Sequence, residues 1–263
     1  MAGSCSVSSN TSELTARQRL TGTGPPYDCC AVSGSALRRS GPGPETGNST
    51  LDSGFVRAWV QAAAAEIAAS RDFLTQLDSA IGDADHGINM DRGFVAALAA
   101  LDADGLDGAG PGQLLEAVGN AIVLKVGGAA GPLYGSAFRE VGAALGDAEA
   151  FGGEDLLRAL RAGAGGVQRL GAAEEGDKTI VDAWLPAVAA FERELRSGGS
   201  AADAAARASV AADEGARQTI PLQARKGRAS YLGPRSVGHQ DPGATSTALL
   251  FSALARAARN HAA

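Results

Sequence analysis

From residue 52 to the C-terminus, Ala-rich amphipathic stretches alternate with short breaks of Gly, Pro and Asp. Apolar residues in these stretches recur at the three- and four-residue spacing of a helix, and the alternation typical of a half-buried strand is scarce. The pattern therefore predicts an all-α fold without internal repeats. The eight predicted helices span residues 53–77, 90–103, 112–126, 132–146, 153–170, 178–197, 200–219 and 242–261.

Several of these segments begin after a residue whose side chain can cap a helix N-terminus. These residues are Asp52 or Ser53, Asn89, Asp177, Ser200 and Asp241. Pro186 lies inside the sixth segment and is expected to kink it. Residues 121–126 (AIVLKV) could form a buried strand, but they continue the apolar face of the residues before them, which favours a helix.

Composition excludes several classes of function. The chain has 263 residues, a formal charge of −6 and 45% hydrophobic residues, which suits a soluble globular protein of one or two domains. The acidic balance argues against non-specific nucleic-acid binding, and no apolar run reaches the roughly 18 residues of a membrane span. Cysteines occur only at Cys5, Cys29 and Cys30, so the rest of the chain has no disulfide, thiol nucleophile or Cys-based metal site.

Residues 1–50 differ from the remainder because they are rich in Ser, Thr, Gly and Pro and have no apolar periodicity. Such a segment buries too little apolar surface to offset its ordering entropy, so we expect a disordered N-terminal extension. A transit peptide is the alternative interpretation of this segment. The folded domain is expected to span residues 51–263.

The unusual residues are concentrated in alternate connections between the predicted helices. In an antiparallel up-and-down arrangement, the connections 1–2, 3–4, 5–6 and 7–8 lie at one end, together with the N-termini of helices 2, 4, 6 and 8. Unpaired N–H groups and positive dipole ends at such N-termini favour an anion, phosphate above all. The four connections read DSAIGDADHGIN, GGAAGP, GAAEEGDKT and PLQARKGRASYLGPRSVGHQDPG.

Asp78, Asp83 and Asp85 fall within one short loop and would repel one another unless a cation or water separates them. Helix capping and Asx-turns are the structural alternative. An EF-hand is excluded because its twelfth position would be Phe94 rather than a bidentate Glu. Hard carboxylate ligands beside a phosphate site instead suit Mg²⁺.

Other short patterns also have alternative interpretations. The stretch 171–179 (GAAEEGDKT) is not a P-loop, because Asp177 separates the glycine from Lys178 and no strand precedes it. No G-x-S-x-G hydrolase signature occurs. The last connection carries four cations that suit phosphate recognition, with a solvated basic loop as the alternative. These cations are Arg225, Lys226, Arg228 and Arg235.

Four longer motifs, GDADHGINM, GGAAGPLYG, GDKTIVDA and GRASYLGPRSVGHQDPGATS, together resemble the DhaL family, the nucleotide-binding subunits of dihydroxyacetone kinase. The resemblance covers residues 53–261, with the motifs in the family's order and spacing. It implies an eight-helix antiparallel up-and-down barrel with an apolar interior, which holds ADP or ATP and two Mg²⁺ at one end.

Carried over by position, the resemblance implies Asp78, Asp83 and Asp85 as metal ligands and Arg228 as the catalytic cation. The implied nucleotide contacts are His86, Gly87, Ile88, Asn89, Ala129, Ala130, Gly171, Ile180, Arg228, Asp241, Pro242 and Gly243. The chain departs from the family pattern at three positions. Ala130 stands where Ser is common, so backbone would replace a hydroxyl contact. Ile180 replaces the usual Met, and Pro234 the usual Glu.

The resemblance implies a cytoplasmic enzyme subunit that passes a phosphoryl group to dihydroxyacetone held by a DhaK-type partner. In the phosphotransferase-system form, ADP stays bound and a DhaM-type subunit rephosphorylates it. The alternatives are an ATP-exchanging kinase, a nucleotide domain of the fatty-acid-kinase type, and a non-catalytic module that senses nucleotide. Against the fatty-acid-kinase type, no second domain is expected before the chain ends. A homodimer stays open, and neither a nucleic acid nor a membrane is expected as a partner.

Overall fold

The structure is a computed structural model and describes residues 50–103 and 105–262. The predicted disorder of residues 1–50 concerns a segment that, apart from Thr50, lies outside the described residues, so it stays a prediction. Within the described ranges the all-α prediction is confirmed. The helices are α1 (Ser53–Ile81), α2 (His86–Leu101), α3 (Pro111–Lys125), α4 (Ala130–Leu145), α5 (Gly153–Gly171), α6 (Val181–Arg196), α7 (Ala201–Gln218), the 3₁₀ helix η1 (Arg228–Ser236) and α8 (Pro242–His261).

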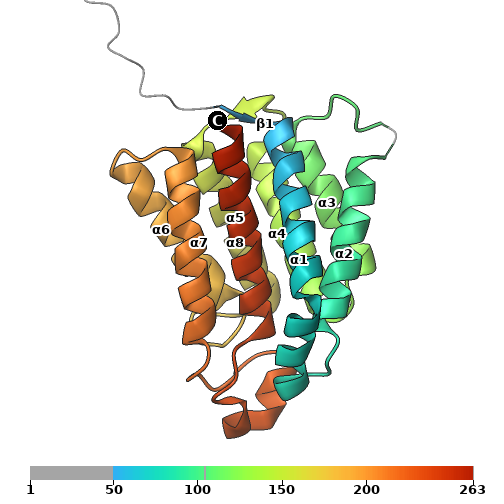
Figure 1. Ribbon diagram of the computed structural model, residues 1–263, viewed down its shortest axis with the longest axis vertical. Helices are drawn as coiled ribbons and strands as arrows, with labels where there is room; N and C mark the ends of the chain where they lie inside the picture. The colour runs from blue at the N-terminus through green and yellow to red at the C-terminus, as the bar shows by residue number, and fades with distance from the viewer. Residues whose placement is uncertain (1–49, 104, 263) are drawn as a thin grey trace, which may run out of the picture. The chain divides into compact units, whose positions relative to one another are not determined.

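The eight α-helices form a closed ring, as the resemblance implied. Each helix packs against the next along the chain, and α8 packs against α1 to close the barrel (Figure 1). At this seam the indole Nε1 of Trp59 donates to the Leu250 carbonyl at 3.0 Å, and Arg256 donates to the Ala62 carbonyl at 2.9 Å. Buried apolar side chains from all eight helices form the main core. Among the described helices, none combines the length and apolar character of a bilayer span.

The two ends of the barrel differ. Strand β1 (Leu51–Asp52) pairs with β2 (Ala150–Phe151) in an antiparallel register that places Leu51 opposite Phe151. This pair and the C-terminal end of α8 lie at the top of Figure 1, whereas η1 lies at the bottom. The strands were not predicted, because two residues are too few to show an alternating pattern. Helix η1 was also missed, inside the long connection between α7 and α8.

Three predicted N-caps are confirmed by side-chain hydrogen bonds. Asp52 accepts from the Phe55 amide at 3.1 Å, Ser200 from Asp203 at 3.1 Å, and Asp241 from Ala244 at 2.6 Å. Each carboxylate or hydroxyl satisfies one of the amides that a helix leaves unpaired at its start.

The predicted caps at Asn89 and Asp177 are wrong. Helix α2 begins earlier, at His86, because the Asp78 carboxylate at the end of α1 accepts from the amides of Asp85 and His86 at 2.9 and 3.1 Å. Asn89 therefore lies in the first turn of α2. Helix α6 begins only at Val181, and the Asp177 carboxylate instead accepts from the Glu174 amide at 3.0 Å.

Candidate functional site

A cavity of about 260 Å³ opens at the end of the barrel that carries η1. Its walls come from the N-terminal ends of α2, α4, α6 and α8 and from the loop that precedes η1. The following predicted site residues line it: Asp78, Asp83, Asp85, His86, Asn89, Ala129, Ala130, Gly171, Ile180, Arg228, Asp241, Pro242 and Gly243. Residues far apart in the sequence thus meet in one place, as the alternation of unusual loops predicted.

Two predicted nucleotide contacts, Gly87 and Ile88, do not line the cavity. Gly87 faces α1 so closely that a Cβ atom there would lie 2.0 Å from the Arg71 carbonyl oxygen. Ile88 is 52% exposed on the outer side of α2. Because helix α2 turns these two side-chain positions away from the cavity, any contact from them would have to come from backbone, and their assignment stays a prediction.

The three aspartates converge as a candidate cation site. One carboxylate oxygen from each of Asp78, Asp83 and Asp85 lies within 4.8 Å of the other two. Oxygen ligands around one Mg²⁺ stand about 2.0–2.1 Å from the ion, so ligands of one ion are about 3–4 Å apart. The carboxylates thus need only a small adjustment to share a cation, and the set of hard oxygen donors fits Mg²⁺.

Each aspartate is held differently. The Asp78 carboxylate is buried and fixed by the two amides at the start of α2. Asp83 pairs with Arg228, whose Nη2 lies 3.0 Å from its Oδ2. The Asp85 side chain makes no capping hydrogen bond to α2. The predicted metal ligands and the predicted catalytic cation therefore occupy the same side of the cavity.

A buried polar network supports the floor of this site. The Tyr134 hydroxyl lies 2.8 Å from the Gly243 carbonyl, 2.7 Å from Ser246 Oγ and 2.8 Å from Thr247 Oγ1. Ser246 Oγ also lies 2.9 Å from His86 Nε2, so the network joins α4, α8 and α2. Burial lowers the pKa of His86 to about 4, which makes its imidazole neutral at physiological pH.

The side of the cavity near α6 contains a second buried group of charges. The Lys178 side chain is 1% exposed, and its Nζ donates to the carbonyls of Thr219 at 2.7 Å, Leu222 at 3.1 Å and His239. One ammonium thereby ties together three loop segments. Burial lowers the pKa of Lys178, and burial raises the pKa of the nearby Asp241 carboxyl to about 7.

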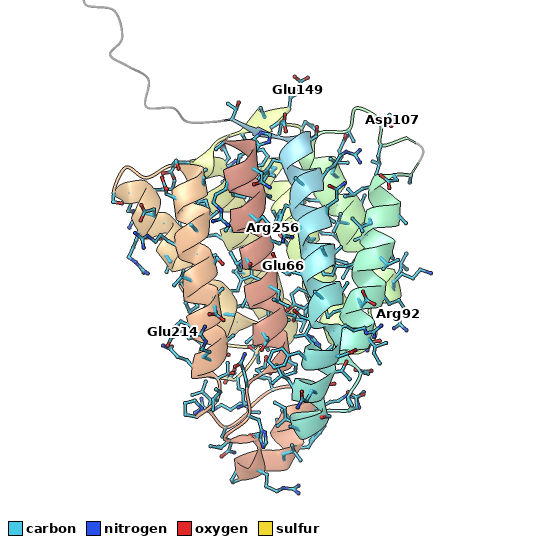
Figure 2. All side chains as sticks on the ribbon, in the orientation of Figure 1. Glu66, Arg92, Asp107, Glu149, Glu214 and Arg256 are labelled. Carbon is cyan, nitrogen blue, oxygen red and sulfur yellow. The ribbon has the colours of Figure 1, made fainter. Side chains whose placement is uncertain are left out.

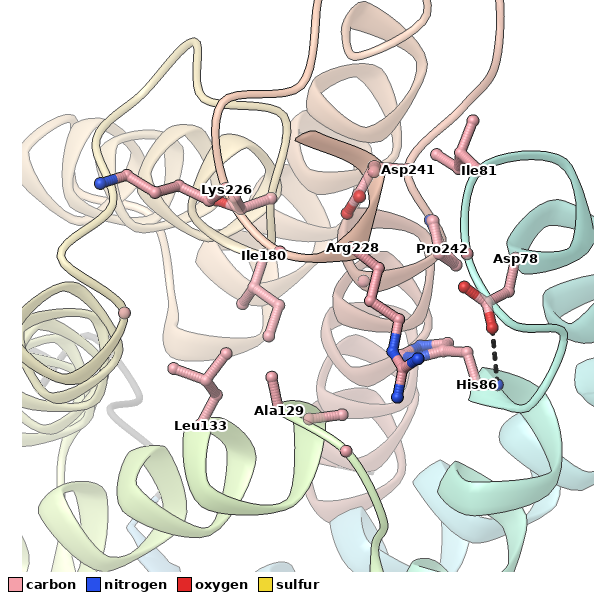
Figure 3. Close-up of a pocket in the computed structure, with 18 of the residues that line it drawn as sticks. Asp78, Ile81, His86, Ala129, Leu133, Ile180, Lys226, Arg228, Asp241 and Pro242 are labelled. Atoms are coloured by element: carbon pink, nitrogen blue, oxygen red, sulfur yellow. Dashed lines mark hydrogen bonds between the residues drawn. The ribbon is translucent and has the colours of Figure 1, made fainter. Parts of the chain in front are cut away.

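One wall of the cavity is apolar. Figure 3 shows Ala129, Leu133 and Ile180 on one side of the space, with Asp78, His86 and Arg228 on the other. Ile180 at the start of α6 is buried, as is Val167 of α5, which also lines the cavity. The site thus separates an apolar surface from a charged one, as a ligand with an aromatic base and an anionic tail would require.

Backbone strain is concentrated around the cavity. Among the described non-glycine residues, positive φ occurs at Ala84 (61°), Ala172 (44°) and Lys178 (64°). Ala84 separates two of the aspartates, and Ala172 directly follows Gly171. Left-handed backbone is costly for a residue with a Cβ atom and tends to persist where function requires a particular geometry.

Leu133, Val167 and Lys178 line the cavity but were not among the predicted site residues. Leu133 and Val167 looked like ordinary core positions of amphipathic helices. Lys178 lies in the motif GDKTIVDA, where the preceding glycine suggests a P-loop that the spacing excludes. The signal in the sequence is a single lysine that has an aspartate on either side and lies just before an apolar helix start. This pattern fits a buried cation whose partners are backbone carbonyls.

Comparison with known proteins agrees with this geometry. The DAK2 domain family model matches residues 80–256. The chain is 44% identical over 188 residues to the "PEP-dependent dihydroxyacetone kinase, ADP-binding subunit DhaL" of Escherichia coli K12, covering 72% of this chain and 89% of that protein. It is 37% identical over 189 residues to the "PTS-dependent dihydroxyacetone kinase, ADP-binding subunit DhaL" of Lactococcus lactis, covering 72% and 89%.

A solved structure also matches. The dihydroxyacetone kinase of C. freundii, in complex with AMP-PNP and Mg²⁺, aligns with a TM-score of 0.59 and 25% identity over 88% of this chain and 38% of that chain. The family match covers the N-terminal ends of α2, α4, α6 and α8, which line the cavity, and the E. coli relative aligns over most of its own length. This chain therefore belongs to the DhaL family of dihydroxyacetone kinase subunits, which carry a DAK2 domain.

Proposed function

We propose that this chain is a cytoplasmic DhaL subunit that binds ADP or ATP with two Mg²⁺ and passes a phosphoryl group to dihydroxyacetone held by a DhaK-type partner. The observation that carries the proposal is the cavity itself, which places three convergent carboxylates and Arg228 opposite an apolar wall. The names of the E. coli and L. lactis relatives, both ADP-binding subunits, support the proposal that this chain binds a nucleotide.

Phosphoryl transfer demands positioning and charge neutralisation more than covalent chemistry by the protein. When bound, Mg²⁺ would neutralise and orient the phosphates, with Asp78, Asp83 and Asp85 as its ligands. Arg228 lies at the carboxylate end and would add positive charge beside the transferred group. The N-termini of α2, α4, α6 and α8 add donors and partial positive charge there.

The apolar wall would take the nucleoside. Leu133, Val167 and Ile180 offer a surface on which a planar base can bury its faces, and the buried Ile180 would fill the place of the Met that is usual in the family. Pro234, which stands where the family has Glu, lies in η1 and does not line the cavity. The neighbouring Arg235 and the exposed Tyr231 would remain available to a partner at this end.

We further propose that ADP remains bound between turnovers and is rephosphorylated in place by a DhaM-type subunit. The relatives described as PEP-dependent and PTS-dependent support this form over an ATP-exchanging kinase. The oligomeric state, monomer or homodimer, is measured alongside.

The test follows the nucleotide and the ketose separately. Purified chain is denatured and its nucleotide identified by chromatography; intact chain is incubated with labelled ATP before and after Mg²⁺ chelation. We expect co-purified ADP that exchanges only after chelation. Fast exchange would instead indicate an ATP-using kinase.

Phosphorylation of dihydroxyacetone is then measured for the chain alone and with a DhaK-type subunit. We expect turnover only with the partner, because the proposal assigns binding of the ketose to the DhaK-type subunit. Turnover by the isolated chain would overturn the subunit assignment. Nucleotide binding without turnover in any combination would favour the sensing module.

A further inference from the structure

Arg92 contacts the cavity wall from outside the barrel. It lies on α2 less than two turns after the start of the helix, and Figure 2 shows it at the outer surface. Its Nε donates to the Lys125 carbonyl at the end of α3 at 2.8 Å, and its Nη2 donates to Asn89 Oδ1 at 2.6 Å. Arg92 is not among the residues that line the cavity.

Asn89 is the inner partner of this contact and lines the cavity while only 6% exposed. A guanidinium group carries donors and no acceptor, so Asn89 must present its amide oxygen to Arg92. Its Nδ2 group is thereby turned away from Arg92. Among the described residues, every fully buried side-chain nitrogen or oxygen has a hydrogen-bond partner. Asn89 Nδ2 has no such partner, so this nitrogen must keep some accessible surface.

One face of the Asn89 amide is bounded by backbone. A Cβ atom at Gly127 would lie 3.0 Å from Oδ1 and 3.1 Å from Nδ2, so only glycine lets the loop before α4 lie against the amide. Arg92 and Gly127 together leave the amide little freedom. Asn89 lines the cavity on the same helical turn as His86 and next to the aspartate loop.

From this geometry we infer that Arg92 is a positioning residue that holds the Asn89 amide with its NH₂ group toward the cavity, where it donates to a phosphate oxygen of the nucleotide. The inference rests on the proposed function. An asparagine amide that is free to rotate by half a turn presents an oxygen as readily as a nitrogen, and an oxygen would repel the anionic ligand. Arg92 removes that second orientation without contacting the ligand.

A purely structural role for Arg92 would give a different result. Its bond to the Lys125 carbonyl places a cation at the C-terminus of α3, which by itself stabilises a helix. If that were the whole role of Arg92, replacing it would lower the stability of the fold, and the orientation of Asn89 would have no effect on ADP binding. A double-mutant cycle separates the two roles because it measures whether Arg92 acts through Asn89.

The cycle uses Arg92→Met, Asn89→Ala and the double variant, with the dissociation constant for ADP measured calorimetrically in Mg²⁺. We expect each single change to weaken binding about 10-fold, the value of one hydrogen bond to a charged group, and the double variant to be no weaker than Asn89→Ala. Arg57→Met is the matched control, because Arg57 donates to the Leu101 carbonyl at 2.7 Å at the opposite end of the barrel. It should bind ADP as the unchanged chain does.

Two outcomes would overturn the inference. One is an unchanged affinity for ADP in Arg92→Met. The other is that Arg92→Met weakens ADP binding by the same factor whether residue 89 is Asn or Ala. If the unchanged chain itself fails to bind ADP with Mg²⁺, the proposed function fails instead. Urea unfolding without ligand checks that each variant is folded. Should Arg92→Met not fold, Arg92→Gln takes its place in the cycle, since Gln keeps a polar chain but can accept as well as donate.

Discussion

Replacing Asp85 by Asn should stabilise the metal-free protein while abolishing its response to Mg²⁺ and nucleotide. The three aspartate oxygens lie within 4.8 Å of one another. Each pair of charges at that separation repels by about 0.9 kcal/mol even in water. Asp85 takes part in two such pairs, and its side chain makes no capping bond that the change would break.

The net effect follows from these opposing terms. Removing two repulsive pairs gains about 1.7 kcal/mol, and losing a negative charge beside the N-terminus of α2 costs about 0.5 kcal/mol. The difference of about 1 kcal/mol should raise the melting temperature of a domain of this size by about 2–4 °C. In contrast, a ligand at 100 times its dissociation constant stabilises the unchanged protein by about 2.7 kcal/mol, a gain that the variant should lose.

Thermal unfolding followed by circular dichroism, in EDTA and in Mg²⁺ with ADP, measures both the gain in metal-free stability and the loss of stabilisation by the ligand. The order of the two melting temperatures should reverse between the buffers. Asp107→Asn is the control, because Asp107 is an exposed aspartate in the α2–α3 connection (Figure 2). If Mg²⁺ and ADP raise the melting temperature of Asp85→Asn as much as that of the unchanged chain, the assignment of the three aspartates as metal ligands is refuted. A lower melting temperature in EDTA would refute the argument from repulsion.

Three further results are expected. Lys178→Met should lower the free energy of unfolding in urea by about 3 kcal/mol, at about 1 kcal/mol for each of three lost hydrogen bonds, whereas Lys125→Met at an exposed position should not. Because the folded-state pKa of Asp241 is raised from 3.8 to about 7, its contribution to stability is complete below pH 3.8 and lost as the pH rises through 7. Asp241→Asn should therefore flatten the fall in metal-free stability over this range, and an unchanged pH profile would contradict the assignment. Deleting residues 1–49 should alter neither melting temperature nor ADP affinity, since their sequence shows no apolar periodicity; a loss of several degrees would show otherwise.

Much of the fold could be predicted because it depends on the local spacing of apolar, capping and loop residues. The apolar repeats predicted each α-helix, and the alternation of plain and unusual connections predicted which end would hold the cavity. The helix starts at Asp52, Ser200 and Asp241 were predictable for the same reason, since a capping side chain bonds to an amide only three residues away. Convergence of Asp78, Asp83 and Asp85 also followed from their closeness in the sequence.

Contacts between distant residues had to await the tertiary structure. Helix α2 begins at His86 rather than at the predicted Met90, because Asp78, from another helix, supplies the hydrogen bonds that a local cap would otherwise provide. The register of α2 then decides that Asn89 faces the cavity while Gly87 and Ile88 do not.

The same limit applies to the buried cation and to the outer arginine. Lys178 bonds to carbonyls 41, 44 and 61 residues away, and Arg92 reaches a carbonyl 33 residues away. The sequence by itself determined which carboxylates, cations and glycines the unusual connections carry, and at which end they gather. Only the tertiary structure decided which atoms face the cavity, because a side chain's direction depends on helix register and on partners that local spacing does not specify.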